Sequence, residues 1–144
     1  MATWSSMSFR EKSAWASFAT LLIVSAAYFW NLLRILFWHA GRSAVDVFGI
    51  LLVVFVVAQA VLHVALRLQS PGDARTPKDE RERLIGLKST EVAFVVLIVG
   101  SLASIGTMHL RVRAWEMAHT TLFAVVLAAL AKFASQIVFY RRDA

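Results

Sequence analysis

Four long apolar runs are separated by polar intervals along the chain. They cover about residues 14–37, 44–66, 91–110 and 114–140. A helix needs about 20 apolar residues to cross the hydrocarbon core of a bilayer, and each run supplies that length. The pattern therefore predicts an all-α integral membrane protein. Its four helices are expected to form a bundle of two transmembrane hairpins in a single domain over residues 1–144.

The polar interval at 67–90 is expected to connect the two hairpins. The segment 76–79, Thr-Pro-Lys-Asp, is a helix start signal, because Thr can cap a helix and Pro fits its first turn. Three residues would then give this short helix an apolar side, namely Leu84, Ile85 and Leu87. We expect a short amphipathic cytoplasmic helix before the third span. Gly86 leaves open whether it lies along the membrane surface or continues into that span.

Basic residues beside the apolar runs predict the orientation of the chain. With the N-terminus inside, the cytoplasmic side would hold Arg10, Lys12, Arg67, Arg75, Lys78, Arg81, Arg83, Lys88, Arg141 and Arg142. The opposite side would hold only Arg34, Arg42, Arg111 and Arg113. Cytoplasmic loops carry an excess of Lys and Arg, so both termini and the connector are predicted to be cytoplasmic.

The N-terminal segment allows two interpretations. Ser8 and Glu11 have the spacing of a capping box, which indicates a helix that begins before the membrane. Basic residues, an apolar stretch and the small residues at 25–27 would also suit a cleaved signal peptide. The apolar run continues to Leu33 and beyond, which favours a retained first span.

Composition narrows the function classes. The chain is 59% apolar and has a net charge of +6. Its basic residues cluster at the ends of apolar runs, which suits lipid headgroups better than nucleic acid, so no nucleic-acid partner is expected. The absence of cysteine excludes a disulfide, an iron–sulfur cluster and a thiol nucleophile.

Two charged stretches carry a family resemblance. They are Asp79-Glu80-Arg81-Glu82-Arg83-Leu84-Ile85 with Lys88-Ser89-Thr90, and Lys132-Phe133 with Gln136 and Tyr140-Arg141-Arg142. Over roughly residues 75–144 the chain resembles a family of short prokaryotic four-helix membrane proteins of unknown function. The resemblance implies a multi-pass protein of the prokaryotic cytoplasmic (inner) membrane, and it brings no reaction, ligand or catalytic residue.

Ionisable and polar residues inside the spans form a first candidate site. A charge at the bilayer centre costs about 2.5–3.5 kcal/mol, so each needs a physical reason. The candidate inner polar cluster consists of Gln59, His63, Glu91, Lys132 and Gln136. Lys132 is expected to pair with Glu91 or to extend toward the headgroups. A proton or ion pathway is the alternative for the same residues.

A second candidate site lies at the opposite end of the spans. Glu116 and His119 have the E-x-x-H spacing that places a carboxylate and an imidazole on one helical face. With His39 and His109 they would suit a divalent transition metal such as zinc, iron or copper. Haem would need facing histidines, and His63 lies at the other end from these three. No cofactor is predicted, and metal and haem remain alternatives.

Small residues predict where the helices pack most closely. The third span carries Gly100 and Ser104 four residues apart, and the fourth carries Ala124 and Ala128. Such spacing lets two helices approach closely, so these two spans are expected to form the tighter pair.

The charged string in the connector is the candidate docking site for a cytoplasmic protein. It comprises Asp79, Glu80, Arg81, Glu82 and Arg83. We expect a non-enzymatic interaction, regulatory or accessory protein that contacts the lipid bilayer and could form a homodimer through its spans. A small oligomeric transporter or channel is the first alternative, and an outer-face metal-binding protein is the second.

Overall fold

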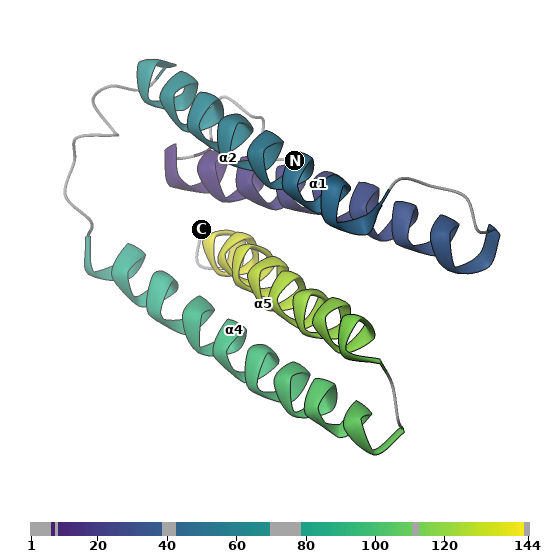
Figure 1. The fold of residues 1–144 in the computed structure, drawn as a ribbon. Helices are drawn as coiled ribbons and strands as arrows, with labels where there is room; N and C mark the ends of the chain where they lie inside the picture. Colours follow the sequence, from purple (N-terminus) through teal and green to yellow (C-terminus); the bar gives the residue numbers. More distant parts are fainter. Residues whose placement is uncertain (1–6, 8, 39–42, 70–78, 111–112, 143–144) are drawn as a thin grey trace. The chain divides into compact units, whose positions relative to one another are not determined.

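The computed structural model describes residues 7, 9–38, 43–69, 79–110 and 113–142. These residues form the long helices α1 (Phe9–Trp38), α2 (Ala44–Gln69), α4 (Glu80–Gly106) and α5 (Ala114–Arg142), with a 3₁₀ turn, η2 (Thr107–Leu110), after α4 (Figure 1). No strand occurs within these ranges. All four long helices have the length and apolar composition needed to cross a membrane, so the predicted all-α class is confirmed.

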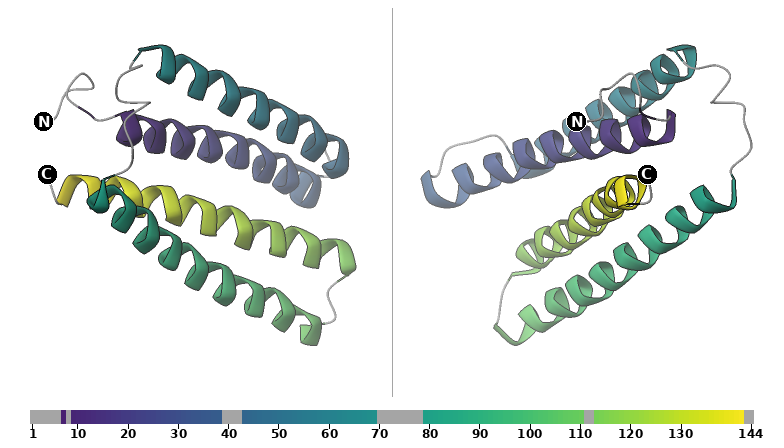
Figure 2. Two further views of the ribbon diagram at one scale, coloured as in Figure 1. Left: turned by 90° about the vertical axis from the view of Figure 1, so that its left-hand side faces the viewer. Right: turned by 180° about the vertical axis from the view of Figure 1, so that it is seen from behind.

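The chain divides into two compact units, residues 1–76 and 77–144. Each unit contains one helical hairpin, α1 with α2 and α4 with α5 (Figure 2). This is the pairing that the sequence predicts, because each short turn joins two neighbouring spans. That both hairpins belong to one membrane domain stays a prediction.

The α4 helix begins earlier than the predicted third span. Asp79 is its N-cap, and the Asp79 carboxylate accepts a hydrogen bond from the backbone N–H of Glu82 at 2.7 Å. The Thr-Pro signal at 76–77 lies outside the described residues, as does Ser8 before α1. The residues predicted to form a short helix before the third span therefore open α4.

Gly86 does not interrupt this helix. Its carbonyl accepts hydrogen bonds from the hydroxyls of Ser89 and Thr90, each at 2.9 Å. Of the two arrangements that the sequence left open, the structure has the continuous one, with 27 residues from Glu80 to Gly106.

The α4 and α5 helices meet at the predicted small residues. A Cβ atom added to Gly100 would lie 2.6 Å from the Cβ of Ala124 and 3.3 Å from its Cα. One turn further, the Ser104 hydroxyl is 2.7 Å from that of Thr121, and Ser104 is only 2% exposed. The helix backbones approach this closely because neither side presents a large side chain at the crossing.

The α1 and α2 helices pack through larger groups at their turn end. The rings of Tyr28 and Phe48 are 5.9 Å apart with an interplanar angle of 72°, an edge-to-face arrangement. Such ring pairs add about 0.5–1.5 kcal/mol to the burial of their area.

Large apolar side chains cover the outward faces of the helices. Val53 of α2 and Leu102 of α4 are each 63% exposed, and many other Val, Leu and Ile side chains are also exposed. A water-soluble monomer rarely exposes a contiguous apolar patch larger than a few hundred Å². Lipid or other helices must therefore cover these faces.

Candidate functional site

Two pairs of polar side chains join α1 to α2 near the end where the hairpin is open. The Ser17 hydroxyl donates to the side-chain oxygen of Gln59 at 3.1 Å, and the Ser13 hydroxyl lies 3.2 Å from Nδ1 of His63. The two pairs form together because the two serines lie four residues apart on α1, and Gln59 and His63 lie four residues apart on α2. Antiparallel helices then bring the four side chains together as two rungs.

The serines were not among the residues singled out from the sequence. A lone Ser carries little information, since its hydroxyl can also bond the carbonyl of its own helix, as Ser25 does with Leu21 at 2.7 Å. The matching four-residue spacing of Ser13 and Ser17 was the available signal, and it becomes meaningful only once the register of the hairpin is known.

The pairs satisfy polar groups in an otherwise apolar hairpin. The Gln59 side-chain oxygen accepts a hydrogen bond from Ser17 of the facing helix, and the Ser13 hydroxyl lies within hydrogen-bonding distance of the His63 ring nitrogen. An unpaired polar group in a bilayer costs several kcal/mol, so this arrangement has a clear structural benefit. The partners are serines of α1, whereas the sequence placed Gln59 and His63 in a cluster with Glu91 and Lys132.

The remaining members of the predicted inner cluster lie in the second hairpin. Glu91 is exposed on α4, whereas Lys132 and Gln136 are half-buried on α5. In the described part of the chain, no ion pair joins Glu91 to Lys132. Glu91 follows the buried Ser89 by two residues, which places it about 200° around the helix from that buried position. The five-residue cluster as a whole stays a prediction.

The candidate metal residues have other contacts. Glu116 accepts a hydrogen bond from the backbone N–H of Arg113 at 3.0 Å and so caps the start of α5. The His119 ring lies edge-on to Trp115, with centroids 5.5 Å apart, and His109 is exposed in η2. His39 lies outside the described residues. Within the described ranges no three metal-ligating residues gather at one point, and the metal site stays a prediction.

The charged string at the start of α4 divides into different roles. Asp79 caps the helix, while Glu80, Arg81 and Arg83 are exposed and Glu82 is half-buried. Leu84 and Leu87, which follow on the same helix, are 46% and 55% exposed. This end of α4 thus combines accessible charges with accessible apolar side chains.

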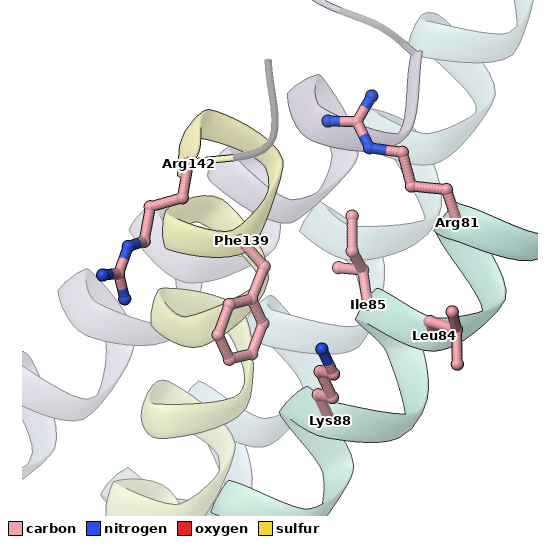
Figure 3. A pocket seen from close by; sticks show the side chains of 6 residues that line it. All are labelled: Arg81, Leu84, Ile85, Lys88, Phe139 and Arg142. Carbon is pink, nitrogen blue, oxygen red and sulfur yellow. The ribbon is translucent and has the colours of Figure 1, made fainter.

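A pocket of about 560 Å³ lies beside this string, between the first turns of α4 and the last turns of α5 (Figure 3). It is lined by Arg81, Leu84, Ile85, Lys88, Phe139 and Arg142. The sequence analysis did not identify it, because it depends on which turn of α5 lies opposite which turn of α4.

No protein-family model matches the chain, and no curated protein or solved structure matches it either. The resemblance to short prokaryotic four-helix membrane proteins therefore stays a prediction.

Proposed function

We propose that this chain is a multi-pass protein of the prokaryotic cytoplasmic membrane that acts as a non-enzymatic interaction or accessory protein. Its α4 helix would dock a cytoplasmic protein partner through its first turns. The observation that carries the proposal is the start of α4, where exposed charges and the exposed Leu84 and Leu87 share a rigid helix.

The membrane placement is supported by length. The α4 helix has 27 residues, which is about 40 Å at 1.5 Å per residue, while a hydrocarbon core is about 30 Å thick. The first two turns of α4 can therefore stand outside the hydrocarbon. The excess of basic residues at this end and at Arg141 and Arg142 supports a cytoplasmic location for it.

The orientation predicts a labelling pattern that is simple to test, because the chain has no cysteine of its own. A cysteine in place of Arg83 is expected to react with a membrane-impermeant maleimide only after the cells are permeabilised. A cysteine in place of Arg113, at the opposite end of the same hairpin, is expected to react in intact cells. Both side chains are exposed, so accessibility within the protein does not bias the comparison. The reverse pattern would contradict the orientation.

The partner is tested by photocrosslinking in living cells. A photoreactive amino acid in place of Arg83 is expected to capture a cytoplasmic protein. The same probe in place of Val99 is expected not to, although Val99 is 62% exposed, because it lies on the apolar part of α4.

The captured protein should disappear when Leu87→Ser is combined with the probe at Arg83. The reason is that Leu87 supplies apolar contact next to the charges, and a serine would remove most of that contact area. If no cytoplasmic protein is captured at Arg83, or if capture is equal at Val99, the docking function is wrong.

A further inference from the structure

We infer that the pocket at the open end of the α4–α5 hairpin binds an anionic phospholipid, with its phosphate held by Arg81, Lys88 and Arg142. Two of these basic residues come from α4 and one from α5, and every charged residue that lines the pocket is basic. This inference rests on the proposed membrane placement of the hairpin, but it does not depend on the protein partner.

The charges fit a phosphate group. A guanidinium offers paired N–H donors that match phosphate oxygens, and a Lys ammonium adds a compact positive charge. All three basic side chains are exposed, so their charged ends can turn toward a ligand. Figure 3 shows them on different sides of the pocket, with the apolar side chains of Ile85 and Phe139 between them.

The apolar lining distinguishes a lipid from a soluble anion. Ile85, which is 3% exposed, is part of the lining, while Leu84 and Phe139 present accessible apolar surface beside the charges. Inorganic phosphate would leave this surface in water, whereas a phospholipid covers it with its glycerol and upper acyl carbons. A volume of about 560 Å³ lies within the usual range of small-molecule sites, about 300–1,000 Å³.

The depth of the pocket agrees with the level of lipid headgroups. Lys88 is two turns inside the start of α4, and Arg142 is the last residue of α5. The apolar part of both helices begins just beyond them. Basic pockets between transmembrane helices on the cytoplasmic side are the kind of site that binds anionic lipid headgroups.

The test uses the full-length protein in a neutral detergent. It is mixed with equal amounts of phosphatidylglycerol and phosphatidylcholine that carry identical acyl chains, and native mass spectrometry counts the lipid that stays bound. The wild-type protein is expected to retain one phosphatidylglycerol in preference to phosphatidylcholine. Lys88→Gln alone should reduce this preference about fivefold, and the triple variant R81Q/K88Q/R142Q should abolish it.

A matched triple variant, R34Q/R67Q/R113Q, removes the same charge from exposed basic residues that do not line the pocket. It should keep the preference. If both triple variants lose the preference for phosphatidylglycerol equally, the lipid is attracted to basic residues in general and the inference is wrong. The inference is also wrong if the wild-type protein shows no preference. Circular dichroism of each variant should show unchanged helix content, since the altered side chains are exposed.

A further arm distinguishes the lipid from a soluble anion. Inorganic phosphate or glycerol 3-phosphate in large excess should displace little phosphatidylglycerol, because neither covers the apolar lining. Complete displacement by either would assign the pocket to a soluble phosphate compound and overturn the lipid inference. If the cysteines are labelled as expected but the protein shows no preference for phosphatidylglycerol, only the lipid inference is wrong. If the protein prefers phosphatidylglycerol but the labelling pattern is reversed, only the proposed orientation is wrong.

Discussion

Gly100→Ala is expected to lower the free energy of unfolding by about 1–3 kcal/mol, the usual cost of adding a methyl group to a filled interface. The added Cβ would lie 2.6 Å from the Cβ of Ala124, so α4 and α5 would have to move apart. Unfolding by sodium dodecyl sulfate in mixed micelles, followed by circular dichroism, measures the change.

Gly86→Ala is the matched control on the same helix. Apart from the adjacent residues and the backbone of its own helix turn, no atom lies within 4 Å of the Cβ that this change would add, so the better helix propensity of Ala should raise stability by up to about 1 kcal/mol. Combining Gly100→Ala with Ala124→Gly should recover part of the loss, because it removes the opposing methyl group. Equal effects at Gly86 and Gly100 would contradict the close approach.

Ser17→Ala is expected to destabilise the first hairpin by about 0.6 kcal/mol, the average for hydrogen bonds between transmembrane helices, and by no more than about 1.7 kcal/mol, the largest such value. The change removes the donor that bonds the Gln59 oxygen at 3.1 Å. Gln59→Leu should have a cost of similar size, and the double variant should be less destabilised than the sum of the two, because no polar group is then left without its partner.

Ser25→Ala is the control for this pair. The Ser25 hydroxyl bonds the carbonyl of Leu21 in its own helix, so its removal breaks no hydrogen bond between helices. Additive effects of Ser17→Ala and Gln59→Leu in the same unfolding assay would show that the two side chains do not interact.

The sequence could predict the elements but not all of their ends. Long apolar runs are sufficient to locate the four helices, since a helix pairs the backbone polar groups of such a run within the run itself. The sequence predicted a helix start at 76–79 but left open whether that helix runs into the third span, because the charged residues between Glu80 and Lys88 do not look like a membrane span. A helix is not obliged to end where its apolar part does, and the Asp79 cap sets the real boundary.

The sites were harder to predict because they depend on register. The close packing around Gly100, Ser104 and Ala124 could be predicted, because small residues spaced four apart on a helix let a neighbouring helix approach. Ser13 and Ser17 were not recognised as partners of α2. The basic pocket also arises only when Arg142 is placed opposite the first turns of α4. A sequence lists donors and charges, whereas the packing of two helices decides which of them share a space.

In the membrane placement that we propose, the unbroken length of α4 would also make the protein sensitive to bilayer thickness. A rod of about 40 Å exceeds a hydrocarbon core of about 30 Å, and the excess is taken up by tilt or by protrusion. In a thinner bilayer the rod tilts further or protrudes more, and in a thicker one its early turns sink toward the acyl chains. Because α4 is continuous through Gly86, we expect the depth of Arg81 and Lys88 to change with the lipid composition of the membrane.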